Sequence, residues 1–100
     1  MNAALLSFTK AMADAGVRDG VQVNAINPGA IRTERLTQRL QAVASLKGVD
    51  MAAAAESFVR DSHITRLGEP SDIAGLVAFI TGPEGRFLQG SLIDMDGGQT

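Results

Sequence analysis

The residues best placed to bind a small molecule follow an apolar run that ends at Pro28-Gly29. Proline lacks an amide proton and glycine adopts backbone angles that other residues resist, so this pair predicts the end of a β-strand. In open parallel sheets, ligands bind just beyond the carboxyl ends of the strands. The small residues that follow and the hydroxyl group of Thr33 therefore predict the edge of a ligand crevice. An ordinary turn is the alternative, and local sequence alone favours it because Pro-Gly pairs mainly punctuate chains.

Charged side chains near this turn and near the C-terminus give weaker signals. Arg32 and Arg35 could attract an anionic ligand, although Glu34 offsets their charge and exposed arginines are common. Asp94 and Asp96 lie two residues apart and could share one face of a strand. Carboxylates beside a Gly-Gly pair more often form a turn than a catalytic pair.

Metal chemistry has little support in the sequence. His63 is the only histidine, and a lone histidine is more often a surface or helix-end residue than a ligand, so we assign it no role. The chain contains no cysteine, which excludes thiolate metal sites and a disulfide scaffold. We therefore predict no metal site.

Composition limits the classes of function. The 100 residues suit one small domain at most, and a hydrophobic content of 45% is too high for a disordered chain. The formal net charge is -2 and the basic residues are dispersed, which argues against binding to nucleic acid or an anionic membrane. No apolar run reaches membrane-spanning length, and the N-terminus lacks the pattern of a signal peptide. We therefore expect a cytoplasmic protein.

The elements that must position the Pro-Gly turn begin with an amphipathic helix. Its apolar stripe at helical spacing consists of Ala4, Leu5, Phe8, Met12 and Ala15. Gly16 marks the expected end of this helix, and Asp19-Gly20 turns the chain toward a strand. The Val-rich run over residues 21–27 predicts that strand and favours a buried position in a sheet.

Two helices are expected after the Pro-Gly break. The first covers residues 34–47 and is closed by Gly48, since Leu36, Leu40, Val43 and Leu46 fall on one helical face. The second covers residues 51–61 and is capped by Asp50.

One further helix and one strand complete the pattern. Pro70 starts a helix that runs to about residue 81, with a buried stripe formed by Ile73, Leu76, Val77 and Ile80. Gly75 within it either marks close packing against another backbone or is simply tolerated. A short strand over residues 91–95 leads into Asp96-Gly97-Gly98. Strand, helices and strand in this order predict a crossover unit with parallel strands.

Three ordered motifs carry a family resemblance. They are Asn27-Pro28-Gly29-Ala30-Ile31-Arg32-Thr33, Arg66-Leu67-Gly68-Glu69-Pro70-Ser71-Asp72-Ile73-Ala74, and Gly90-Ser91-Leu92-Ile93-Asp94-Met95-Asp96-Gly97-Gly98. Together they resemble the C-terminal part of short-chain dehydrogenases/reductases. The resemblance covers nearly the whole chain, but less than half of the fold usual in that family.

The resemblance implies an α/β fold, namely the C-terminal portion of a Rossmann-like three-layer α/β/α fold with parallel strands. Residues 1–100 would form an incomplete domain that contributes the last two strands of a seven-stranded sheet. Residues 34–62 would be a helical insertion that acts as a lid over substrate. Simple packing of two helices is the alternative for this insertion.

The resemblance also implies a set of cofactor contacts. Pro28 and Gly29 would lie beside the nicotinamide ring of NAD or NADP, and Gly29 would let the flat ring approach the backbone. The backbone of Ile31 would meet the carboxamide, and Thr33 would reach the pyrophosphate side. Hydroxyl and exposed N–H groups suit carboxamide and phosphate oxygens.

The family's catalytic residues have no counterpart here. Its Gly-rich turn, its serine and its Tyr-x-x-x-Lys set are missing, and the chain contains no tyrosine. We therefore predict no catalytic residue in this chain and no activity for the chain alone. The sequence looks like a fragment, either a truncated gene product or a proteolytic remnant.

Two functions stay open at this stage. The first is a segment of an NAD(P)-dependent oxidoreductase that acts on a small alcohol or carbonyl substrate as a homo-oligomer. In the resembling family the opening helix packs in one subunit interface, and the helix over 69–81 with the strand over 91–95 packs in another. The second is a non-catalytic assembly module derived from the same fold. Substrate, reaction direction and the choice between NAD and NADP are not encoded in these motifs.

Overall fold

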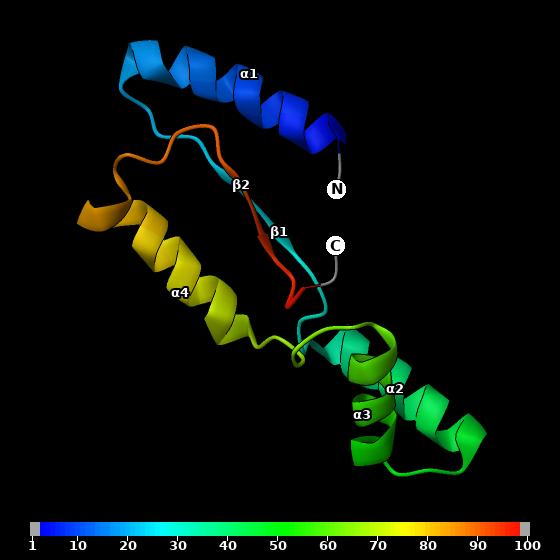
Figure 1. The fold of residues 1–100 in the computed structure, drawn as a ribbon. Coiled ribbons are helices and arrows are strands. Elements are labelled where there is room, and N and C mark those ends of the chain that lie inside the picture. Colours follow the sequence, from blue (N-terminus) through cyan, green and yellow to red (C-terminus); the bar gives the residue numbers. More distant parts are fainter. Residues whose placement is uncertain (1–2, 99–100) are drawn as a thin grey trace. The chain divides into compact units, whose positions relative to one another are not determined.

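The computed structural model describes residues 3–98. Its elements are α1 (Ala3–Asp19), β1 (Ala25–Pro28), α2 (Glu34–Lys47), α3 (Met51–Asp61), α4 (Pro70–Thr81), the 3-10 turn η1 (Pro83–Gly85) and β2 (Leu92–Met95) (Figure 1). They form two compact units. The first contains the chain up to Pro28 together with Ser71–Met95, and the second contains Gly29–Pro70 together with the chain from Asp96.

The first unit is built on a pair of parallel strands. β1 pairs with β2, so that Ala25 lies opposite Leu92 and Pro28 lies opposite Met95. Helices α1 and α4 lie on opposite sides of this strand pair (Figure 1). The predicted parallel pairing and the layered α/β arrangement are therefore confirmed, and β1 ends at Pro28 as the Pro-Gly pair predicts.

The strand predicted over residues 21–27 begins later, at Ala25. Two polar side chains in the preceding segment bind backbone carbonyls elsewhere in the first unit. The Gln22 side chain donates to the Ile80 and Gly85 carbonyls at 3.1 and 2.8 Å. The Asn24 side chain donates to the Leu88 carbonyl at 3.2 Å. The polar residues that interrupt the apolar run thus connect it to the segment after α4.

The first helix differs from the prediction in its end and in its buried face. α1 continues through Gly16 to Asp19, and its buried residues are Thr9, Ala13 and Gly16. A Cβ atom at Gly16 would lie 2.4 Å from the Val21 carbonyl oxygen, so this glycine permits a close approach instead of ending the helix. Phe8 and Met12 of the predicted apolar stripe are 64% and 46% exposed. Small side chains face inward because the returning chain lies close to them.

Helices α2 and α3 begin and end where the sequence predicts. The αL conformation of Gly48, with φ of 66°, ends α2. The Asp50 carboxylate accepts a hydrogen bond of 2.8 Å from the Ala53 N–H and caps α3. Their buried residues, with the segment that follows α3, form the core of the second unit: Leu40, Ile64 and Leu67, surrounded by Ala30, Leu36, Met51, Ala55, Phe58 and Val59.

Helix α4 begins at Pro70 as predicted, but its buried stripe is only partly present. Ile80 is buried, whereas Val77 is 44% exposed. No atom of another segment lies within 4 Å of a Cβ built on Gly75, so among the described residues this glycine is tolerated and close packing there was a wrong interpretation.

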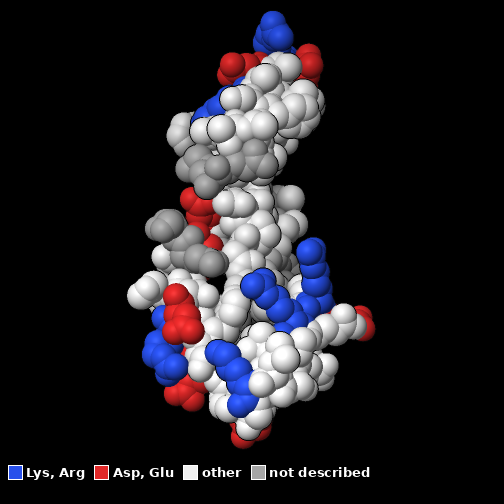
Figure 2. Space-filling model, turned by 90° about the vertical axis from the view of Figure 1, so that its right-hand side faces the viewer, with Lys and Arg blue, Asp and Glu red and all other residues white. Residues whose placement is uncertain are grey.

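Charge and hydropathy complete the description of the surface. On the face shown in Figure 2, basic and acidic side chains are both present, and some of opposite sign lie next to each other. None of the helices within residues 3–98 combines the length and the hydropathy that crossing a bilayer requires.

Candidate functional site

The turn after β1 is held by packing at Gly29. A Cβ atom at this position would lie 2.6 Å from the Asp96 Cβ and 2.7 Å from the Asp96 Cα. The missing side chain therefore makes room for Asp96, a reason for glycine that the sequence did not reveal. The Asp96 carboxylate accepts a hydrogen bond of 3.0 Å from the Gly98 N–H, which fits the turn-forming role expected for it.

A parallel bridge ties the next residues of this loop to a distant segment of the second unit. The Arg32 N–H donates to the Gly68 carbonyl at 2.7 Å, and the Gly68 N–H donates to the Ala30 carbonyl at 2.9 Å. The groups of the loop that form these bonds belong to Ala30 and Arg32, the two neighbours of Ile31. The N–H and C=O of Ile31 itself therefore point away from Gly68. The Ile31 carbonyl accepts from the Thr33 N–H at 2.8 Å. Within residues 3–98 the Ile31 N–H donates no hydrogen bond, which leaves this donor available.

Thr33 caps the helix that follows the loop. Its hydroxyl oxygen accepts a hydrogen bond of 3.4 Å from the Leu36 N–H, and its own backbone is extended, as an N-cap requires. The side chain is exposed. A hydroxyl that accepts in this way keeps its proton, so Thr33 can still donate to a ligand oxygen.

The four residues predicted to contact the cofactor thus lie within the six residues from Pro28, at the end of β1, to Thr33, at the end of the loop that follows. Pro28 is the last residue of β1 and is exposed, while Gly29 and Ile31 are half-buried. The loop offers an open backbone donor and a hydroxyl within three residues of each other. Such a pair can bind amide or phosphate oxygens.

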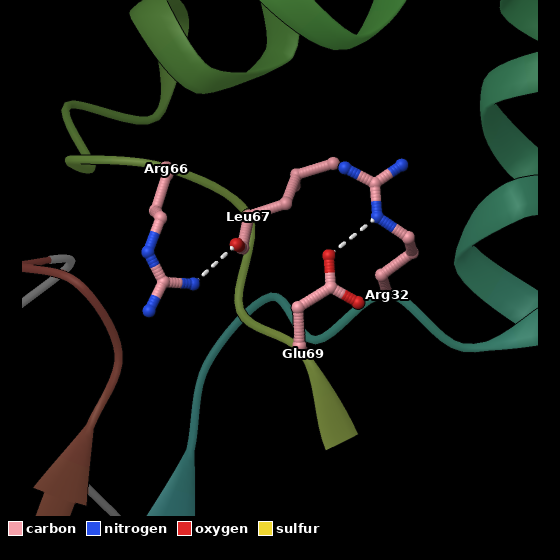
Figure 3. A network of polar contacts seen from close by, with 4 residues as sticks. All are labelled: Arg32, Arg66, Leu67 and Glu69. Carbon is pink, nitrogen blue, oxygen red and sulfur yellow. Dashed lines mark hydrogen bonds and ion pairs between the residues drawn. The ribbon is translucent and has the colours of Figure 1, made fainter. Parts of the chain in front are cut away.

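One ion pair and one hydrogen bond of arginine side chains lie beside this loop in Figure 3. The Arg32 Nε donates to the Glu69 Oε1 at 2.9 Å, with the two side chains 52% and 45% exposed. The Arg66 guanidinium donates to the Leu67 carbonyl at 2.9 Å. Sequence reasoning expected Glu34 to offset Arg32, and the structure identifies Glu69 as its partner. The RLGEP motif was visible in the sequence, but no local signal connects it to a residue 37 positions earlier.

Two ionisable candidates from the sequence remain, Asp94 and His63. Asp94 accepts a hydrogen bond of 3.0 Å from the Asn27 side chain, across the strand pair of the first unit. His63 has φ of 57° just after α3, in agreement with a helix-end role. Across residues 3–98, no three His, Asp or Glu side chains gather so that they could hold a metal ion.

Comparison with known proteins shows the relationships of the chain. The profile of the family described as enoyl-(acyl carrier protein) reductase matches residues 1–100. The 2-keto-3-deoxy-L-fuconate dehydrogenase of Xanthomonas campestris pv. campestris is 41% identical over 96 residues, which are 96% of this chain and 31% of that protein. The chain spans about a third of the length of the curated relatives that it matches.

Solved structures give the same picture. L-sorbose reductase from Gluconobacter frateurii, complexed with NADPH and L-sorbose, matches with a TM-score of 0.86 and 28% identity, over 97% of this chain and 37% of that one. A 4-hydroxyisoleucine dehydrogenase complexed with NADH matches with a TM-score of 0.75 and 32% identity, over 97% of this chain and 36% of that one.

Proposed function

The chain belongs to the short-chain dehydrogenase/reductase family, and from this premise we propose that it is the C-terminal segment of an NAD(P)-dependent oxidoreductase. The complete protein transfers a hydride between NAD or NADP and a small alcohol or carbonyl substrate. Both kinds of cofactor occur in the similar structures, NADPH in the L-sorbose reductase and NADH in the 4-hydroxyisoleucine dehydrogenase. The cytoplasmic location stays a prediction from composition.

The observation that carries this proposal is the open Ile31 N–H at the carboxyl end of β1. When bound, the cofactor supplies or accepts the hydride, and the protein's task is to orient it. Pro28 and Gly29 would form the surface beside the nicotinamide, and the Ile31 N–H would donate to the carboxamide oxygen. The Thr33 hydroxyl, whose proton is not used by the α2 cap, would donate to a pyrophosphate oxygen.

The proton-transfer groups of the reaction lie outside this chain in the proposal. No tyrosine is present, and Asp94 and Asp96 accept hydrogen bonds from Asn27 and Gly98. The chain therefore contributes cofactor contacts and not a catalytic residue.

We also propose that residues 34–62 form the lid over substrate. Helices α2 and α3 pack on the core of the second unit, and Leu46 on α2 is 88% exposed. An exchange of 34–62 between two family members tests this role. It is expected to change substrate preference and leave the affinity for NADPH unchanged, whereas unaltered preference would contradict it.

Exposed apolar side chains favour a homo-oligomer and give some weight to a second function, the non-catalytic assembly module. They include Phe8 at 64%, Val17 at 66%, Phe79 at 51% and Phe87 at 103%. An upstream coding sequence with the Gly-rich turn and the Tyr-x-x-x-Lys set would decide for the enzyme.

A graft tests the cofactor proposal directly. Residues 1–100 replace the matching segment of the L-sorbose reductase, and NADPH binding is titrated for Thr33→Ser and Thr33→Asp. Aspartate keeps the N-cap, so α2 stays stable, but it places a negative charge beside the pyrophosphate. We expect Thr33→Ser to bind normally and Thr33→Asp to bind about tenfold more weakly or worse.

The matched control is Ser45→Asp, which adds the same charge at an exposed position near the other end of α2. Equal NADPH affinity for Thr33→Asp and Ser45→Asp would remove Thr33 from the site.

A further inference from the structure

Arg32 is attached at two points to one short segment of the second unit. Its backbone N–H donates to the Gly68 carbonyl at 2.7 Å, and its side-chain Nε donates to the Glu69 Oε1 at 2.9 Å (Figure 3). Main chain and side chain of one residue thus bind two consecutive residues. The Gly68 N–H completes the attachment by donating to the Ala30 carbonyl at 2.9 Å.

This attachment lies between the two donors that the proposed function assigns to the cofactor. Ile31 precedes Arg32 and Thr33 follows it. Because the bridge fixes the peptide planes on both sides of Ile31, it also fixes the direction of the Ile31 N–H. The Thr33 N–H donates to the Ile31 carbonyl at 2.8 Å and so links the backbone on the two sides of Arg32. A rotation of the backbone at Arg32 would therefore move the Ile31 N–H and the Thr33 hydroxyl together.

The charges of the pair argue against a direct role in binding an anion. The Arg32 guanidinium faces a carboxylate at ion-pair distance, so the pair presents little net charge to a phosphate. Arg35 lies three residues further along, is exposed, and forms no ion pair within residues 3–98. The side chains of Arg32 and Glu69 are themselves half exposed, so their attraction adds little to global stability.

We propose that the Arg32–Glu69 ion pair is a positioning clamp for the cofactor-contacting loop. It holds the loop against the Gly68-Glu69 segment so that the Ile31 N–H and the Thr33 hydroxyl keep their direction before any cofactor binds. Arg32 and Glu69 act through these two groups and do not touch the cofactor. The inference rests on the proposed function for its purpose, but the clamp itself is a property of this chain that can be measured without cofactor.

The first measurement is amide hydrogen exchange on the chain 1–100 without cofactor. Arg32→Gln and Glu69→Gln each remove one charge of the pair, and the double exchange Arg32→Glu with Glu69→Arg restores a pair of reversed polarity. We expect each single variant to speed exchange of the Arg32 and Gly68 amides by about two- to fivefold, the range open to an exposed pair. The reversed pair is expected to return most of this protection.

Two controls separate the clamp from general loosening. Arg35→Gln removes the same charge three residues away and is expected to leave the Arg32 and Gly68 amides unchanged. The amide of Leu40, a buried residue within α2, reports opening of the whole unit and is expected to keep its rate in all variants. Unchanged exchange rates of the Arg32 and Gly68 amides in both single variants would overturn the clamp, whatever the result of the NADPH titration.

The second measurement is NADPH titration of the same variants in the L-sorbose reductase graft. A positioning role predicts that Arg32→Gln and Glu69→Gln weaken binding by similar factors, again about two- to fivefold, and that the reversed pair restores it. If Arg32→Gln weakens binding while Glu69→Gln strengthens it, Arg32 contacts phosphate directly and the inference is wrong. If exchange accelerates but NADPH affinity stays the same while Thr33→Asp still weakens binding, the positioning role is wrong and the proposed function stands.

Discussion

At Gly29, the absence of a side chain makes room for the Cα and Cβ atoms of Asp96. A methyl group there would lie 2.6 to 2.7 Å from two Asp96 carbons, and backbone atoms cannot move aside as a flexible side chain can. Gly29→Ala is therefore expected to lower the free energy of unfolding by about 1–3 kcal/mol, the usual cost of overpacking. Urea denaturation of the chain 1–100 measures this.

Gly75→Ala is the matched control, because it makes the same chemical change in open space within α4. It is expected to raise the free energy of unfolding by up to about 1 kcal/mol. Equal effects of the two substitutions would show that Asp96 does not pack on Gly29.

The sequence predicted where the loop of the candidate site begins and ends, but not the contacts that hold this loop. Pro28 ends β1 and Thr33 starts α2, as punctuation and capping rules predict. The contacts of Gly29 with Asp96 and of Arg32 with Glu69 join residues far apart in the chain. Local patterns contain no information on such pairings, so only the structure reveals them.

Helix α3 offers a test at the scale of single elements. It has 11 residues, and a helix this short depends on its cap and on packing. Because the Asp50 carboxylate satisfies the Ala53 N–H, Asp50→Ala is expected to destabilise the chain by about 1 kcal/mol. Asp50→Asn keeps a capping oxygen and is expected to cost much less. Thermal unfolding followed by circular dichroism compares the two, and equal losses would contradict a capping role.

The ends of helices were predicted well where a capping residue or a glycine marks them. The buried face of a helix was predicted poorly, because it depends on contacts with other segments. The ends of α2 and α3 follow from Gly48 and Asp50. The predicted face of α1 was wrong, because Phe8 and Met12 are exposed while Thr9 and Ala13 are buried. Periodicity shows that a helix has two faces, but which one is buried depends on how closely the next segment approaches.

For the whole molecule, the first prediction concerns activity. The chain 1–100 is expected to show no NAD(P)-dependent turnover, because it has no tyrosine to act as the family's proton donor. Spectrophotometric assay of the reduced cofactor with alcohol and carbonyl substrates measures this. Turnover that a single substitution within the chain abolishes would contradict the proposed division of roles.

The last prediction concerns association. Each strand of the described sheet pairs on one side only, and the outer edges of such strands offer unpaired backbone groups. Phe87 is fully exposed, and Phe8 and Val17 are more than half exposed. Exposed apolar groups and open strand edges favour contact with another surface, so we expect the chain to self-associate at micromolar concentration.

Two kinds of variant separate association from folding in sedimentation experiments. Leu76→Asp or Leu92→Asp places a charge on a half-buried side chain and is expected to disrupt folding and association together. Phe87→Ser changes a side chain that is fully exposed, so it is expected to reduce association while leaving the unfolding transition in place. A compact monomer of the unmodified chain with a cooperative unfolding transition would contradict this. It would mean that the two strands and four α-helices described within residues 3–98 complete a core without a further surface.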